Sequence, residues 1–77
     1  MNKIKELRFK AGLTLRDLAT KSGLSLYSVM AFEHGTYTPY KGTIKALAKA
    51  LGVAEYDLRA LYLEAKQEAE AENDTGK

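Results

Sequence analysis

Residues 14–35 read TLRDLATKSGLSLYSVMAFEHG, and the signals in this stretch decide the fold. Thr14 followed by Asp17 is a capping pair that marks the start of one helix, and Ser25 marks the start of a second. Gly23 lies between them, and glycine is the residue through which a chain most easily leaves a helix in the left-handed conformation. The stretch therefore predicts two short helices joined by a tight turn.

Apolar and small residues recur through this stretch at helical spacing, which predicts the sides of the two helices that face the core. They are Leu18, Ala19, Leu24, Val29 and Phe32. The small Ala19 side chain allows the two helices to cross closely. The opposite side of the second helix is then left to face outward.

The same kinds of signal predict three further helices. Gly12 and Gly52 stand where terminating glycines belong, and Pro39 prevents a continuous helix through the loop after Gly35. The predicted helices span residues 3–11, 15–22, 26–34, 41–51 and 55–71. Outside the central stretch, the residues on their apolar stripes are Ile4, Leu7, Ala11, Ile44, Leu47, Ala48, Leu51, Leu58, Leu61, Tyr62 and Ala65. The predicted fold class is all-α, a compact five-helix bundle.

Length and composition exclude several classes of protein. A chain of 77 residues buries one modest core, which excludes a multi-domain organisation. With no cysteine and the single histidine His34, the sequence predicts no disulfide, no metal site and no cofactor, and the lack of a nucleophile and base pair argues against an enzyme. No apolar run approaches the roughly 20 residues that span a bilayer, and no signal peptide is visible, so we expect a cytoplasmic location without membrane contact.

The net charge of +2 hides an asymmetry along the chain. Residues 1–50 carry nine basic and three acidic residues, a net charge of +6, whereas residues 51–77 carry three basic and seven acidic residues, a net charge of −4. A basic body suits an anionic partner such as nucleic acid, although charged helix faces also serve solubility alone. Lys41, Lys45 and Lys49 recur every four residues and predict a basic ridge on the fourth helix.

Arg8 lies on the otherwise apolar face of the first predicted helix. A guanidinium buried there without a partner costs about 3–5 kcal/mol. Glu33 is the only acidic residue between Asp17 and Glu55, so we expect it to pair with Arg8. Phe9 points away from this face; it is either covered by the C-terminal helix or by a second subunit, or it is partly exposed.

The last predicted helix begins in the folded domain and continues into a C-terminal extension. Residues 1–65 form the folded domain, and residues 66–77, KQEAEAENDTGK, are an acidic extension whose helix we expect to fray into disorder. Tyr56, Tyr62 and Leu63 are left over when the bundle is closed, which suggests a contact in a symmetric dimer. The alternative is that Tyr62 packs in the core and the other two side chains lie on the surface.

The chain resembles the Xre/Cro family of phage-repressor-type helix-turn-helix proteins over roughly residues 4–58. The matching motifs are IKELR-x3-GLT at 4–14, DLA at 17–19, SGLS at 22–25, Val29, FEHG at 32–35, Pro39 and IKALAKALGV at 44–53. The resemblance implies a lambda-repressor-like fold, in which the second and third helices form the helix-turn-helix motif and the third enters the major groove of B-DNA. It also implies an ion pair at the positions of Arg8 and Glu33.

Carried across by position, the resemblance implies two sets of DNA-contacting residues. The base-reading set is Leu26, Tyr27, Ser28, Met30 and Ala31, with His34 at its margin. The phosphate-contacting set is Thr14, Leu15 through its backbone N–H, Arg16, Ser25, Thr36, Tyr37 and Lys41. The sequence departs from the family pattern at Leu15, where a glutamine is common, and in the apolar outer surface of its third helix.

Two functions are compatible with these patterns. The first is a sequence-specific double-stranded DNA-binding transcriptional regulator, a repressor that binds an inverted-repeat operator as a homodimer. Apolar side chains of the third helix would then contact thymine methyl groups. The alternative is a module whose apolar outer face binds a protein partner rather than DNA. Either the last helix mediates a symmetric dimer and its acidic end lies outside the DNA footprint, or the Glu/Ala-rich end enters the linker of a longer regulator.

Overall fold

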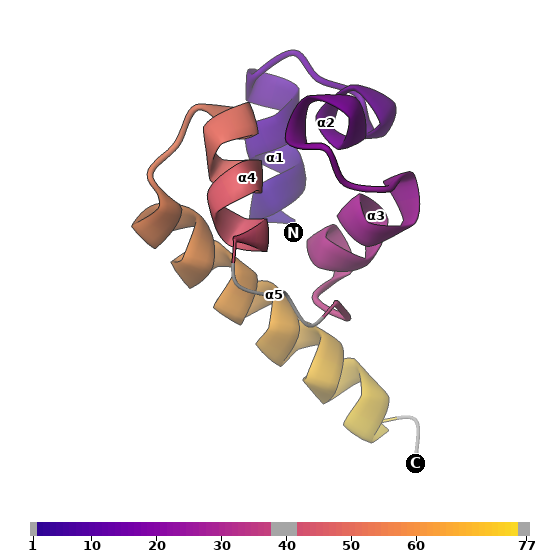
Figure 1. Cartoon of the computed structure of the whole chain (residues 1–77). Coiled ribbons are helices and arrows are strands. Elements are labelled where there is room, and N and C mark those ends of the chain that lie inside the picture. Colours follow the sequence, from indigo (N-terminus) through magenta and orange to yellow (C-terminus); the bar gives the residue numbers. More distant parts are fainter. Residues whose placement is uncertain (1, 38–41, 76–77) are drawn as a thin grey trace.

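The computed structural model of the chain describes residues 2–37 and 42–75, which form five α-helices (Figure 1). The helices are α1 (Lys3–Lys10), α2 (Leu15–Ser22), α3 (Leu26–His34), α4 (Thr43–Leu51) and α5 (Glu55–Thr75). The predicted all-α fold and the positions of α2 and α3 are therefore confirmed. The molecule measures 37 × 24 × 23 Å, and it is elongated because the C-terminal half of α5 extends beyond the other helices.

The two helix starts predicted in the central stretch are both capped as expected. The Thr14 hydroxyl accepts the Asp17 amide at 3.0 Å, and the Asp17 carboxylate accepts the Thr14 amide at 3.0 Å, which completes a capping box. At the start of α3, the Ser25 hydroxyl accepts the amide of Ser28 at 3.0 Å. Gly23 ends α2 with a φ of 80°, the left-handed conformation that lets the chain turn directly into α3.

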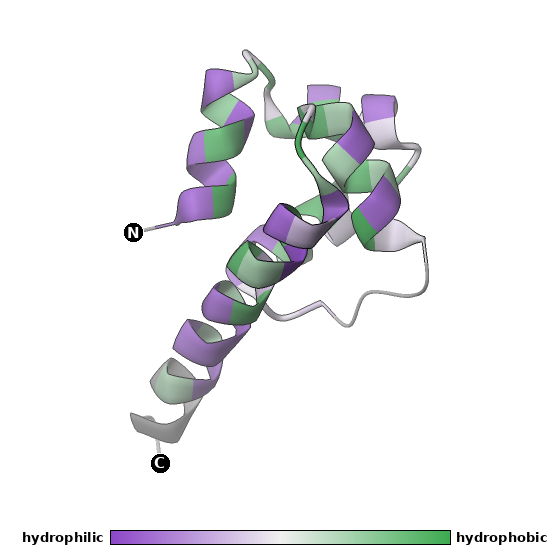
Figure 2. Ribbon diagram, turned by 90° about the vertical axis from the view of Figure 1, so that its left-hand side faces the viewer, coloured by the Kyte–Doolittle hydropathy of each residue, from purple (hydrophilic) through white to green (hydrophobic). Residues whose placement is uncertain are grey.

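The core lies where the four short helices meet one side of α5. Its buried apolar residues are Ile4, Leu18, Ala19, Val29, Phe32, Leu47, Ala48, Ala50, Leu51, Leu58 and Tyr62. α2 packs against α3 and α4, and α5 crosses α4, α3 and α1. Figure 2 shows hydrophobic residues where the helices meet, whereas the coloured part of α5 that extends beyond the other helices is mostly hydrophilic. Partly buried residues such as Leu7, Leu24 and Ile44 pack around this centre.

Gly35 marks the closest approach between α3 and α5. It ends α3 with a φ of 77°, and a Cβ atom at this position would collide with the backbone carbonyl of Ala65. Phe32 of α3 stacks on Tyr62 of α5, with ring centroids 4.6 Å apart and an angle of 14° between the ring planes. The C-terminal end of α3 is therefore held directly against the middle of α5.

Three helix boundaries differ from the predicted ones. α1 ends one residue early, so Ala11 is its exposed C-cap rather than an inward-facing residue. Gly42 is the N-cap of α4 with a φ of 96°, so helical geometry begins at Thr43 and not at residue 41. α5 continues to Thr75 instead of ending near Ala71, because residues 66–72 are strong helix formers without glycine or proline.

Among the described residues, no helix has both the length and the apolar character that crossing a lipid bilayer requires.

Candidate nucleic-acid interface

The helix-turn-helix pair places one side of α3 in the core and the other toward the exterior. Leu18 and Ala19 of α2 are buried, as are Val29 and Phe32 of α3. These contacts fix the orientation of α3 about its own axis. Residues on its opposite side are therefore presented outward by a helix whose rotation is set by packing.

The predicted base-reading residues occupy the first two turns of α3. Tyr27 is 79% exposed, Met30 is 40% exposed and Leu26 is 36% exposed. Ser28 and Ala31 are half-buried beside them. We name the surface formed by these five residues the α3 outer face. His34, at the far end of the helix, is exposed and lies three residues, or just under one turn, beyond Ala31.

Few side-chain polar groups are available on the α3 outer face. The hydroxyl of Ser25 donates to the hydroxyl oxygen of Ser28 over 2.9 Å, so Ser28 is partly engaged by the cap. The phenol of Tyr27 is the largest polar group there. Leu26 and Tyr27 also belong to the first turn of α3, where backbone amides lack partners within the helix. The face is apolar in its side chains and polar at its helix start.

The predicted phosphate-contacting residues gather mainly at the starts of α2 and α3. Thr14, Arg16, Ser25 and Thr36 are exposed. Leu15 is half-buried and packs against the core with its side chain. Its amide belongs to the first turn of α2 and points out of the helix start, as the amide of Arg16 does. The start of α2 therefore carries two free backbone amides, the exposed Arg16 and the Asp17 carboxylate of the capping box.

The remaining members of this set contribute differently. The Thr36 hydroxyl donates to the backbone carbonyl of Ala31 at 3.3 Å, and Tyr37 packs against the core with part of its side chain. Both follow the C-terminal end of α3. Lys41 lies outside the described residues.

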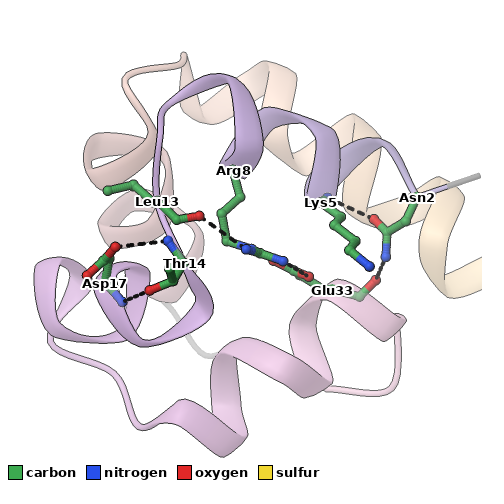
Figure 3. A network of polar contacts seen from close by, with 7 residues as sticks. All are labelled: Asn2, Lys5, Arg8, Leu13, Thr14, Asp17 and Glu33. Atoms are coloured by element: carbon green, nitrogen blue, oxygen red, sulfur yellow. Dashed lines mark hydrogen bonds and ion pairs between the residues drawn. The ribbon is translucent and has the colours of Figure 1, made fainter.

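A buried ion pair holds α1 against the end of α3 (Figure 3). Nε of Arg8 donates to Oε2 of Glu33 at 2.6 Å, and Nη2 donates to Oε1 at 3.4 Å. Nη1 of Arg8 donates to the carbonyl of Leu13 at 3.1 Å, in the turn that leads into α2. The predicted pair is thus present, and it connects α1, the turn before α2 and the end of α3.

Asn2 is a positioning residue that the sequence analysis missed. Its side-chain oxygen accepts the amide of Lys5 at 3.0 Å, which caps α1, and its side-chain nitrogen donates to the carbonyl of Glu33 at 2.9 Å (Figure 3). An asparagine directly before an amphipathic run is itself a capping signal. Asn2 therefore connects the start of α1 to the last turn of α3 through two hydrogen bonds.

The three residues predicted for the dimer contact separate into two environments. Tyr62 is only 4% exposed and stacks on Phe32, so its assignment to a subunit contact is corrected: it is a core residue. Tyr56 and Leu63 are 80% and 52% exposed. They are seven residues apart, so they lie on one side of α5.

Phe9 is exposed, and α5 does not cover it. The guanidinium carbon of Arg8 lies 4.9 Å from the centre of its ring, and the ammonium of Lys5 lies 5.7 Å away. Both distances are within the range of cation–π interactions. In the single chain, Phe9 is therefore partly exposed, as one of the alternatives for this residue predicted.

Among the side chains of residues 2–37 and 42–71, no cluster of three His, Asp or Glu is arranged to hold a metal ion. A hollow between α1, the end of α3 and α5 is lined by Asn2, His34, Glu64 and Glu68 among others. Lys3 and Glu64 form an exposed ion pair of 3.2 Å beside it.

The capped α2, the glycine turn and the outward-facing α3 define a helix-turn-helix protein of the Xre/Cro type. A family profile described as a helix-turn-helix domain matches residues 1–64, and the chain therefore belongs to this helix-turn-helix family. The match covers α1 to α4 and the first half of α5. Comparisons with curated proteins and with solved structures gave no match. The family assignment makes DNA the class of partner suggested for this fold.

Proposed function

We propose that the protein is a sequence-specific regulator of transcription, a repressor that inserts α3 into the major groove of double-stranded DNA. The observation that carries the proposal is the capped helix-turn-helix of residues 14–35 within a chain that matches a helix-turn-helix family over residues 1–64. The excess positive charge of residues 1–50 favours association with the phosphate backbone. The proposal includes a cytoplasmic location on nucleoid DNA and no catalytic activity.

The starts of α2 and α3 support the expected docking geometry. First-turn amides and the exposed Arg16 lie at the start of α2, and Ser25 lies exposed at the start of α3. In a groove-bound helix-turn-helix, such groups contact phosphates on either side of the recognition helix. Thr36 and Tyr37 follow α3 and complete the proposed phosphate set on its other side.

The proposed operator is an inverted repeat bound by a homodimer. Two recognition helices related by a two-fold axis read half-sites about one helical turn apart. Tyr56 and Leu63 give α5 an exposed apolar side that a second copy would cover. Residues 66–77 form the acidic extension, outside the DNA footprint.

A binding-site selection with the full chain tests DNA binding. Random duplexes are selected at low salt, and the affinity of the enriched duplex is measured at several salt concentrations. We expect an enriched inverted repeat and an affinity that falls steeply with salt. Failure of a folded protein to enrich any sequence would overturn the proposal.

Arg16→Ala and Arg59→Ala form a matched pair of variants for the same assay. Each removes one exposed arginine, but Arg59 lies on α5 and pairs with Glu55 at 3.0 Å. We expect Arg16→Ala to weaken binding to all sequences and to reduce the slope of log affinity against log salt by about one. Arg59→Ala should leave the slope unchanged. Equal effects of the two substitutions would argue against a phosphate contact at the start of α2.

The exposed apolar side chains of the α3 outer face favour one alternative, in which this face binds a protein partner. Leu26 and Met30 are more typical of an interface centre than of a DNA-contacting surface. A double variant, Leu26→Asp with Met30→Asp, tests it by affinity capture from cells. Loss of a specific protein partner would support the alternative, and retention of every partner would exclude it.

A further inference from the structure

The α3 outer face offers almost none of the groups that read purine edges. α3 has the sequence LYSVMAFEH, so it contains no arginine, lysine, asparagine or glutamine. These are the side chains that make two parallel hydrogen bonds to guanine or adenine in the major groove. The acid of this helix, Glu33, is buried in its ion pair with Arg8. Discrimination by paired hydrogen bonds from this helix is therefore excluded.

What the face does offer is hydrocarbon. Leu26 and Met30 expose more than a third of their surfaces, and the methyl group of Ala31 lies half-buried one residue beyond Met30. Among the groups that the four bases expose in the major groove, the apolar substituent is the 5-methyl group of thymine. A leucine or methionine side chain that covers this methyl group removes apolar surface from water, which favours binding. Contact with a hydrogen-bonding base edge gives no comparable free energy.

We propose that the α3 outer face reads the 5-methyl groups of pyrimidines, with Leu26 and Met30 as the specificity-determining residues. This inference rests on the proposed DNA binding and names the feature of the operator that would be recognised. The half-site then contains thymines opposite α3, and 5-methylcytosine can replace thymine as the source of the methyl group. Tyr27, with its phenol, reaches a base edge or a phosphate beside them.

The spacing of the two side chains suits neighbouring base pairs. Leu26 and Met30 are four residues apart, which is about 6 Å along the helix axis. Base pairs are stacked about 3.4 Å apart, so the two side chains span about two steps. Residues four apart share one side of a helix, so both side chains lie on the exposed side of α3. We therefore expect two methyl contacts within two or three consecutive base pairs of each half-site.

The experiment begins with the duplex enriched by random selection. Each thymidine of a half-site is replaced in turn by deoxyuridine, which removes only the methyl group, and binding is measured by fluorescence anisotropy at constant salt. We expect a loss of about three- to fivefold at one or two adjacent positions and no change elsewhere. At those positions, a change to cytosine should weaken binding and 5-methylcytosine should restore part of it.

Variants of the protein assign the methyl contacts to residues. Met30→Ala should reduce the thymidine-to-deoxyuridine difference at one position to less than about 1.5-fold, whereas Met30→Leu should keep it. Leu26→Ala should do the same at a neighbouring position. Circular dichroism establishes that each variant is folded, which is expected because these side chains are exposed.

The outcomes separate the two levels of the proposal. An enriched duplex that binds equally well with deoxyuridine at every position would overturn methyl reading and leave DNA binding intact. A deoxyuridine effect that persists in both alanine variants would overturn the assignment of methyl reading to Leu26 and Met30. No enrichment of any duplex would overturn the proposed function and, with it, this inference.

Discussion

Nε of Arg8 lies 2.6 Å from Oε2 of Glu33, and only 5% and 6% of the two side chains are exposed. Both carboxylate oxygens of Glu33 accept hydrogen bonds from Arg8, and Arg8 also donates to the carbonyl of Leu13. Among the described residues, no buried side-chain nitrogen or oxygen lacks a hydrogen-bond partner. Two opposite charges that are buried together depend on each other, since either one alone would be an uncompensated charge in the core.

Glu33→Ala should therefore lower the free energy of unfolding by about 3–5 kcal/mol, measured by urea denaturation followed by circular dichroism. The double variant Arg8→Met with Glu33→Leu should recover most of this loss, because it removes both charges. Glu55→Ala is the matched control. It breaks an exposed i, i+4 pair with Arg59 and should cost no more than about 0.5 kcal/mol. Equal effects of the two alanine substitutions would contradict the burial of the Arg8–Glu33 pair.

The capping box at the start of α2 should make stability depend on pH in the acidic range. The amide of Thr14 and then its hydroxyl group lower the pKa of the Asp17 carboxyl below its ordinary value of 3.8. The folded state therefore favours the ionised form, and the stabilisation is present above pH 3.8 and lost as the pH falls through the lowered pKa. The free energy of unfolding should therefore change less between about pH 6 and about pH 2 in Asp17→Asn than in the unmodified chain. These two pH values lie on either side of the range in which Asp17 titrates.

Thr14→Ala removes the other half of the box and should cost about 1 kcal/mol, whereas Thr14→Ser should cost much less because serine also caps. Thermal denaturation of the two variants at neutral pH compares them directly. A serine variant as unstable as the alanine variant would show that the threonine methyl group, rather than the hydroxyl, stabilises α2.

Tyr62 should produce a loss of stability in the alkaline range. Burial, and secondly the Glu70 carboxylate, raise the pKa of the phenol above its ordinary value of 10.0. The folded state thus favours the neutral phenol, and its stabilisation is present below pH 10.0 and lost as the pH rises through the raised pKa. Tyr62→Phe should remain more stable than the unmodified chain at high pH. Tyr56→Phe, at a position 80% exposed, is the control and should leave the pH profile unchanged.

The exposed side of α5 leads to a prediction about oligomeric state. If a second copy covers Tyr56 and Leu63, Leu63→Asp should place a charge in the contact and shift the protein toward monomer. Analytical ultracentrifugation over a range of concentrations measures this shift. A chain that is monomeric at high concentration would contradict the proposed dimer.

Gly35→Ala should destabilise the protein more than the same substitution at Gly23. Both glycines have a positive φ, which costs an alanine about 1–2 kcal/mol. The added Cβ meets nothing within 4 Å at Gly23, but at Gly35 it meets the backbone of Ala65 and Lys66. Urea denaturation of the two variants isolates the cost of the collision from the cost of the backbone conformation. Equal losses would mean that α5 can move away from α3 without penalty.

Local signals in the sequence were sufficient for most of the fold. The caps at Thr14 and Ser25 and the glycine at position 23 act within a few residues, so the bounds of α2 and α3 followed from them. The partner of Arg8 could be predicted because the sequence contains only one acidic residue between Asp17 and Glu55.

Features that depend on tertiary contacts could not be predicted in this way. Helical spacing placed Tyr62 on the apolar stripe of its helix, but only its stacking on Phe32 decides that it packs in the core and not against a second subunit. The hydrogen bond from Asn2 to the end of α3 joins residues 31 positions apart, which no local pattern encodes. For the candidate site, residue types indicated an apolar outer face, but the degree of exposure of each side chain required the packed bundle.

The close approach at Gly35 also connects the long α5 helix to the end of α3. Because Gly35 has no side chain, the backbone of α5 at Ala65, near the middle of this helix, lies directly against the end of α3. Beyond this contact, α5 continues for ten residues to Thr75, a length of about 15 Å. A tilt at the far end of α5 would therefore change the contact between Ala65 and Gly35, which ends α3, the proposed recognition helix.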